Sequence, residues 1–228
     1  MKGRNYKIMG KIKLFIILII TVLLTIPAYA DAADNRIDTG QTDVDYYGQY
    51  QNLISRDETR VRVFDLSYGE AEKIPVLLYH HLLKEEEYYY EDNPAAITLE
   101  AFEEQMAYLD KYGFNTITLV ELEKFLKGQM DVPKRSVVIT FDDGYSSNYH
   151  YAYPILKGYG FDASIFLITH SIKDMSETFT PERSTPLGWD QIVNSMDVFE
   201  YANHSHNLHR EDENGSNYLA IKPYDVIK

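Results

Sequence analysis

Short apolar runs alternate with amphipathic stretches between residues 74 and 202. The runs have the length and the β-branched content of strands, and the stretches between them carry apolar residues at helical spacing. The predicted strands, in chain order, are 74–79, 115–118, 136–141, 163–168 and 198–202. The predicted helices, in chain order, are 99–112, 118–126, 149–157 and 189–196. This alternation predicts an α/β fold with a parallel sheet, either open or closed into a barrel. The first run is uniformly apolar, which predicts a strand buried on both faces.

Two of the predicted helices have recognisable start signals. Thr98 precedes a helix in which Phe102, Met106 and Leu109 share one face. Residues 118–121 have the threonine-to-glutamate spacing of a capping box, in which each side chain bonds the backbone N–H of the other residue. Both helices are therefore expected to begin at a threonine.

The most specific chemistry follows the strand 136–141, which runs directly into Asp142, Asp143 and Gly144. The carboxyl ends of parallel strands form the edge at which α/β enzymes place their catalytic groups. Because side chains alternate along a strand, one aspartate can bind a metal ion while the other faces a reacting water molecule. The alternative is that the pair only begins a turn and caps the next helix.

Three histidines follow the last predicted strand, namely His204, His206 and His209. Imidazole is a common zinc ligand, and one carboxylate with two imidazoles leaves a position open for water. On a regular helix His204 and His209 would be about 140° apart, so they could share one ion only across a loop or an irregular turn. His206 and His209 could share a helical face. The sequence predicts a metal site at the sheet edge without selecting the pair.

The first 30 residues have the pattern of a secretory signal peptide. Five basic residues are followed by an apolar run from Leu14 to Ile26, and Ala28 and Ala30 are small residues at cleavage spacing. As a helix the run covers about 20 Å, less than the roughly 30 Å hydrocarbon core of a bilayer. We expect export with cleavage after Ala30, and an uncleaved membrane tether is the alternative.

Composition divides the rest of the chain and limits its partners. Residues 31–73 are polar and are expected to form a linker or stalk, and residues 74–228 a folded domain. The net charge is −13, and because residues 1–30 hold five of the 22 basic and none of the 35 acidic residues, the remainder carries −18. This charge argues against nucleic acid or anionic lipid as a partner. The absence of cysteine excludes disulfide bonds and a lipid-modified cysteine.

Three ordered motifs resemble those of the polysaccharide deacetylase family, also called the NodB-homology domain or carbohydrate esterase family 4. The motif residues are 75–80, 140–166 and 204–209. The resemblance covers residues 74 to about 210 and implies the N-terminal part of a distorted (β/α) barrel. The five-residue step from His204 to His209 is more similar to the branch that de-N-acetylates poly-β-1,6-N-acetylglucosamine than to peptidoglycan and chitin deacetylases.

The resemblance also implies roles for single residues. Asp143, His204 and His209 are expected to bind a divalent metal ion, most commonly zinc, and Asp142 is expected to be the general base. Such a metal ion polarises the acetamide carbonyl group and lowers the pKa of a water molecule, from which the base takes a proton. Structural rather than catalytic roles are expected for the other polar residues of the motifs, His80, Tyr145 and His206.

Two further motifs of the family have no convincing counterpart in this sequence. Members carry an arginine and a proline-tyrosine segment, and a late leucine-x-histidine whose histidine is the general acid, whereas this sequence ends 19 residues after His209. The domain is therefore expected to be incomplete. We expect a secreted, metal-dependent hydrolase of N-acetyl groups on N-acetylglucosamine-containing polysaccharides. A weak or inactive remnant that binds metal and carbohydrate is the alternative, and an O-acetyl esterase is another.

Overall fold

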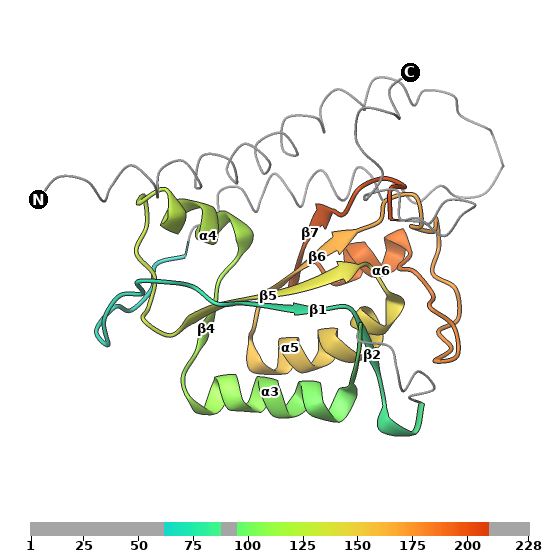
Figure 1. Cartoon of the computed structure of the whole chain (residues 1–228), viewed down its shortest axis with the longest axis horizontal. Helices are drawn as coiled ribbons and strands as arrows, with labels where there is room; N and C mark the ends of the chain where they lie inside the picture. Colours follow the sequence, from blue (N-terminus) through green and yellow to red (C-terminus); the bar gives the residue numbers. More distant parts are fainter. Residues whose placement is uncertain (1–61, 88–94, 210–228) are drawn as a thin grey trace, which may run out of the picture. The chain divides into compact units, whose positions relative to one another are not determined.

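Residues 62–87 and 95–209 are described by a computed structural model of the chain. Their main sheet has the strand order β1-β5-β6-β7, with β4 paired to β5, and every pairing is parallel (Figure 1). The strands, in chain order, are β1 (Val76–Tyr79), β4 (Asn115–Thr116), β5 (Ser136–Asp143), β6 (Ala163–Leu167) and β7 (Phe199–Asn203). The predicted α/β class with a parallel sheet is confirmed, and the described strands form an open sheet rather than a closed barrel.

A second, two-stranded parallel sheet was not predicted. It pairs β2 (His81–Leu83) with β3 (Ala96–Thr98). The helices, in chain order, are the 3-10 helix η2 (Glu85–Glu87), α3 (Leu99–Lys111), α4 (Leu119–Leu126), the π-helix η3 (Asn148–Ala152), α5 (Tyr153–Tyr159) and α6 (Trp189–Asn194). Within the described ranges, none of the helices has the length and hydropathy needed to cross a membrane. The predicted signal peptide lies outside these ranges.

Helices α3 and α4 begin as predicted. The side chain of Thr98 accepts a hydrogen bond from the backbone of α3, and Thr118 and Glu121 form the reciprocal capping box of α4. The helix predicted over 149–157 is instead two segments, η3 and α5. Pro154 stands in the first turn of α5, where its missing N–H group is tolerated but a continuous helical ladder is not.

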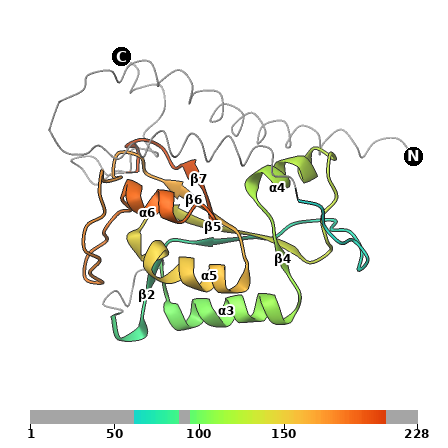
Figure 2. The same cartoon turned by 180° about the vertical axis from the view of Figure 1, so that it is seen from behind.

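The hydrophobic core lies on the face of the sheet covered by α3 and α5, which run side by side (Figure 2). Phe102 and Met106 of α3, Leu156 of α5, Phe141 of β5 and Ile165 of β6 are all fully buried. Burial of a large apolar side chain stabilises the fold by about 1.5 to 3 kcal/mol. This packing fixes the strands from which the polar residues of the sheet edge emerge.

Strand β1 corrects one prediction. Val76 and Leu78 are 53% and 56% exposed, although Tyr79 is buried. Side chains alternate along a strand, so Leu77 and Tyr79 face the core while Val76 and Leu78 point to the opposite face. The prediction that this strand is buried on both faces is therefore wrong.

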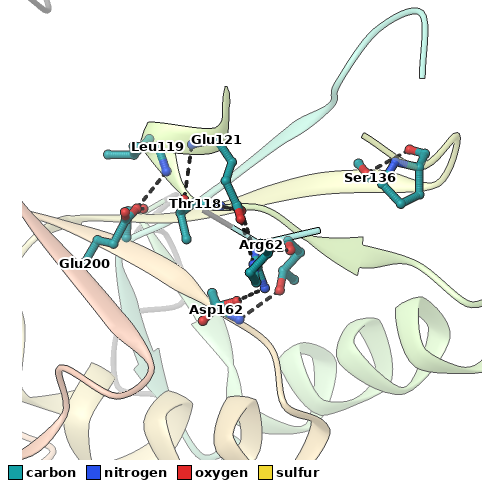
Figure 3. A network of polar contacts seen from close by, with 10 residues as sticks. Arg62, Thr118, Leu119, Glu121, Ser136, Asp162 and Glu200 are labelled. Atoms are coloured by element: carbon teal, nitrogen blue, oxygen red, sulfur yellow. Dashed lines mark hydrogen bonds and ion pairs between the residues drawn. The ribbon is translucent and has the colours of Figure 1, made fainter. Parts of the chain in front are cut away.

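Residues 62–73, which were expected to belong to a linker, contact the domain. The Arg62 guanidinium group donates from Nε to Glu121 Oε1 over 2.8 Å and from Nη2 to the backbone oxygen of Thr116 over 2.9 Å, and it also pairs with Asp162 (Figure 3). Glu121 belongs to the capping box of α4, so this one arginine joins the segment to a helix and to two strand regions.

A small second hydrophobic cluster includes the same segment. Its buried members are Ile117, Val132 and Val138. Phe64 and Ala71 pack against them, and Glu70 forms an isolated β-bridge with Pro133. The packed structure therefore includes Arg62, which corrects the predicted start of the domain at residue 74.

Arg62→Ala is expected to lower the free energy of unfolding by about 3 kcal/mol. The Glu121 side chain is only 1% exposed, so removal of the arginine leaves a buried carboxylate without its charged partner. Unfolding in urea would measure the loss. Lys127→Ala is the matched control, because it breaks a more exposed pair with Glu123 and should change stability by less than about 1 kcal/mol. Equal effects of the two substitutions would contradict this account.

Candidate metal centre

The candidate site lies at the carboxyl ends of β1, β5 and β7. Strand pairing aligns Asp143 of β5, across β6, with Asn203 of β7, so His204 emerges one residue beyond the level of Asp143. On the other side of β5, strand β1 ends one residue before His80. Parallel pairing thus gathers at one edge residues that are far apart in the sequence.

Asp143, His204 and His209 converge on one point. Asp143 Oδ1 lies 3.7 Å from Nε2 of His204 and 3.7 Å from Nε2 of His209. One ligand atom from each of the three residues lies within 4.8 Å of the other two. His206 is not in this group, and its Nδ1 lies 3.0 Å from the hydroxyl group of Thr169. The geometry thus brings His204 and His209, rather than His206, to Asp143.

These three residues fit a divalent metal ion. Nitrogen and oxygen ligands lie about 2 Å from zinc, so two ligand atoms of a tetrahedral site are roughly 3.3 Å apart, close to the 3.7 Å observed between Asp143 and each histidine. Asp143 Oδ1 is buried and has no hydrogen-bond partner in the structure as described. A buried carboxylate oxygen without a partner is costly, and a cation beside it would remove that cost.

The backbone turns sharply at the two aspartates. Asp143 has φ 73°, in the left-handed region that side chains other than glycine rarely occupy, and Gly144 follows with φ 76°. A Cβ atom on Gly144 would lie 2.7 Å from Leu167 Cδ2, so no larger residue fits without displacement. Strained residues concentrate at functional sites. The left-handed backbone therefore lies at Asp143 and at the glycine after it.

Asp142 lies beside the group of three without belonging to it. Its Oδ2 atom is 3.9 Å from Nε2 of His204 and 3.9 Å from Nε2 of His80. Burial raises the pKa of the Asp142 carboxyl group above its ordinary value, the imidazoles of His204 and His80 oppose this rise, and the Asp143 carboxylate adds to it. A carboxylate whose pKa is raised is a stronger base.

His80 lies at the same edge of the sheet, next to Asp142. It was expected to be structural, yet its ring faces the Asp142 carboxylate. Its place immediately after β1, at the same sheet edge as the aspartates, is the signal that could have identified it.

Tyr145 was also expected to have a structural role, and its ring packs on the ring of His81, with 4.8 Å between the centroids. Burial, the charge of Asp143 and a hydrogen bond to Asp143 raise the pKa of Tyr145 to about 12.

Buried His81 makes stability depend on pH. Its Nδ1 lies 2.8 Å from Ser147 Oγ and its Nε2 has no partner in the described structure, so an added proton would be uncompensated. Burial lowers the pKa of His81 to about 4. The unfolded chain takes up this proton near pH 6.5, so the free energy of unfolding should fall by up to about 3 kcal/mol as the pH drops from 6.5 to 4.

His81→Gln should remove this part of the pH dependence, because glutamine does not titrate. Urea unfolding at a series of pH values would measure, for each variant, the slope of the free energy of unfolding against pH. The exposed His170 provides a control, and His170→Gln should leave the slope unchanged. A slope that is the same in wild type and His81→Gln would show that His81 does not titrate as its burial requires.

The chain is similar to known polysaccharide deacetylases. Residues 129–219 match the family model described as polysaccharide deacetylase. Over 100 residues the chain is 38% identical to YxkH of Bacillus subtilis, whose name assigns it to the polysaccharide deacetylases, covering 44% of this chain and 33% of that protein. Over 124 residues it is 31% identical to a poly-β-1,6-N-acetyl-D-glucosamine N-deacetylase of Staphylococcus aureus, covering 54% and 42%. The chain thus spans less than half the length of these relatives.

Solved structures show the same likeness. IcaB from Ammonifex degensii is 26% identical and superposes with a TM-score of 0.53, covering 68% of this chain and 61% of that one. The Streptococcus pyogenes deacetylase PplD, solved in complex with acetate, is 25% identical with a TM-score of 0.51, covering 62% of each chain.

Proposed function

Because this chain belongs to the polysaccharide deacetylase family, we propose that it is a metal-dependent hydrolase that removes acetyl groups from N-acetylglucosamine-containing polysaccharide. The observation that carries the proposal is the convergence of Asp143, His204 and His209 next to a separate carboxylate, Asp142. The substrate class is supported by the name of the Staphylococcus aureus relative, a poly-β-1,6-N-acetyl-D-glucosamine N-deacetylase. Zinc is the metal that the two imidazoles and one carboxylate favour.

Asp143, His204 and His209 would hold the metal ion. When bound, the ion supplies a Lewis acid that polarises the acetamide carbonyl group and makes a water molecule more acidic. Asp142 would take a proton from the attacking water as the new C–O bond forms. Collapse of the tetrahedral intermediate breaks the C–N bond, and the products are acetate and a free sugar amine.

His80 is the candidate for the proton donor to the leaving amine. In the described structure, the imidazoles within 4.0 Å of the Asp142 carboxylate are those of His80 and His204, and His204 is assigned to the metal. The His80 side chain is 27% exposed, so solvent reaches it. This assignment gives His80 a catalytic role in place of the structural role expected from the sequence.

His80→Gln is expected to lower kcat by about 10²-fold or more, because a positioned general acid is lost. Zinc affinity should stay within about twofold of wild type, since His80 is not among the three converging ligands. Acetate release and a zinc competition assay would measure the two quantities. His150→Gln alters an imidazole that lies against Phe179 and provides the control. An unchanged kcat in His80→Gln would remove His80 from the reaction.

The remaining parts of the proposal concern place and polymer. The basic and apolar pattern of residues 1–30 supports export, and the substrate would then be an extracellular or cell-surface polymer. The five-residue step between His204 and His209, with the Staphylococcus aureus relative, supports poly-β-1,6-N-acetylglucosamine as the polymer. The acidic character of the chain is compatible with a product that gains positive charge as acetyl groups are removed.

Acetate release from poly-β-1,6-N-acetylglucosamine oligomers, with and without a chelator, tests the proposal. We expect release that stops when the metal is removed and returns when zinc is added. The other candidate is a non-catalytic module that binds metal and carbohydrate through the same three converging residues. Zinc binding without any acetate release would support that module and contradict the hydrolase.

A further inference from the structure

The loop that carries His204 and His209 brings the two imidazole rings together although they are five residues apart. His204 and His209 would point in different directions on a regular helix, yet their ring centroids are only 5.2 Å apart. The backbone achieves this with Ser205 in the left-handed region at φ 70°. The Ser205 hydroxyl group also accepts a hydrogen bond from Leu208 N over 3.2 Å, which closes the turn toward His209.

This loop is hydrogen-bonded to the segment that follows β6. Beyond the end of the β6–β7 ladder, Thr169 N donates to the backbone oxygen of Ser205 over 3.2 Å, and His170 N donates to that of His206 over 2.9 Å. The hydroxyl group of Thr169 lies 3.0 Å from His206 Nδ1. Thr169 therefore contacts the loop through both its backbone and its side chain.

Little apolar burial holds the loop in place. His206, Leu208 and His209 are exposed, so the conformation depends on hydrogen bonds rather than on a packed core. Segments with few buried contacts open easily. Thr169 hydrogen-bonds His206. Among the described residues between His204 and His209, His206 is the last one that is hydrogen-bonded to the segment following β6.

We propose that Thr169 is a positioning residue for the metal centre: by bonding His206 it holds the loop 205–209 so that His209 Nε2 reaches Asp143 Oδ1. This inference rests on the proposed metal site. The hydrogen bonds of Thr169 described above reach Ser205 and His206 rather than the three ligand residues, so it acts through the loop. The hydrogen bond gives His206, a residue outside the ligand group, a defined task in place of a general structural role.

Zinc affinity of the full chain, measured by competition with a chromophoric chelator, tests the inference. Groups that orient metal ligands typically change affinity by about 10- to 100-fold, and we expect Thr169→Val to weaken zinc binding by about tenfold. Thr169→Ser keeps the hydroxyl group and should restore affinity to within about twofold of wild type. The cobalt-substituted Thr169→Val protein should also show an altered d–d absorption spectrum, which a change in general stability would not produce.

A double-mutant cycle with His206→Phe makes the test specific. Phenylalanine keeps a ring but lacks Nδ1, so His206→Phe should weaken zinc binding as much as Thr169→Val, and the double variant no more than either one. Asp174→Asn is the control, because it changes an exposed side chain a few residues after Thr169 and should bind zinc as wild type does.

The outcomes separate this inference from the proposed function. If Asp143→Asn binds zinc as tightly as wild type, the metal site itself is wrong and the inference fails with it. If zinc binding depends on Asp143 but Thr169→Val and His206→Phe bind normally, the metal site stands and the positioning role of Thr169 is refuted.

Discussion

Asp142→Asn is expected to lower the rate of acetate release by about 10²- to 10⁴-fold while zinc binding persists. The amide keeps the size of the carboxylate but cannot accept a proton from the attacking water molecule. Asp142 lies 3.9 Å from His204 and is not among the three converging ligands, so its substitution should leave the metal centre assembled. Single-turnover acetate release and zinc competition on the same preparation would measure both effects.

The matched control for Asp142→Asn is Asp174→Asn. Asp174 is an exposed aspartate of the segment between β6 and α6, and its substitution should leave the rate within about twofold of wild type. A full rate in Asp142→Asn would exclude this carboxylate as the base. Loss of zinc together with loss of rate would instead mean that Asp142 is a ligand.

Asp143→Asn is expected to weaken zinc binding by more than about 100-fold and to reduce acetate release to background, because one of the three proposed protein ligands loses its charge. Asparagine tolerates the left-handed backbone conformation of this position, so the metal-free variant should remain folded. Zinc should raise the Tm of wild type, because a ligand that binds only the native state stabilises it. The Tm of Asp143→Asn should not respond to the same zinc concentration.

A rise in Tm with zinc that is equal in wild type and Asp143→Asn would show that the ion binds elsewhere. Glu177→Gln provides a comparison on the surface. Its carboxylate is exposed and pairs loosely with Lys173 and Arg183, so the variant should keep the zinc-induced rise.

The parts of the fold that follow from local pattern were predicted well. Capping at Thr98 and Thr118 and the strand that ends in Asp142 and Asp143 follow from spacing and turn chemistry within a few residues. The parallel pairing follows from the alternation of strands and helices along the chain. Pro154 is also a local signal, and it divides the predicted helix into η3 and α5.

Contacts between distant segments could not be predicted in this way. Nothing near Arg62 in the sequence indicates that Glu121 and Asp162 surround it, and the segment therefore read as a linker. The exposed face of β1 is a similar case. An apolar run does not reveal whether other parts of the chain cover both faces of the strand.

The candidate site also combines features that local sequence predicts with features that depend on contacts between distant segments. Adjacent aspartates at a strand end could be identified from sequence, and so could the cluster of histidines. Which two histidines converge depends on the left-handed turn at Ser205 and on the contact with Thr169, which helical periodicity does not describe. The position of His80 beside Asp142 depends on the pairing of β1 with β5, and it became visible only with the strand order.

X-ray absorption spectroscopy at the zinc edge, on the full chain loaded with one equivalent of zinc, tests the central claim most directly. We predict a first shell of nitrogen and oxygen ligands at about 2.0 to 2.1 Å, with the outer-ring scattering of two imidazoles. His209→Ala should reduce that signal to one imidazole. A spectrum without imidazole scattering, or one that is unchanged in His209→Ala, would contradict the assignment of Asp143, His204 and His209 as the metal ligands.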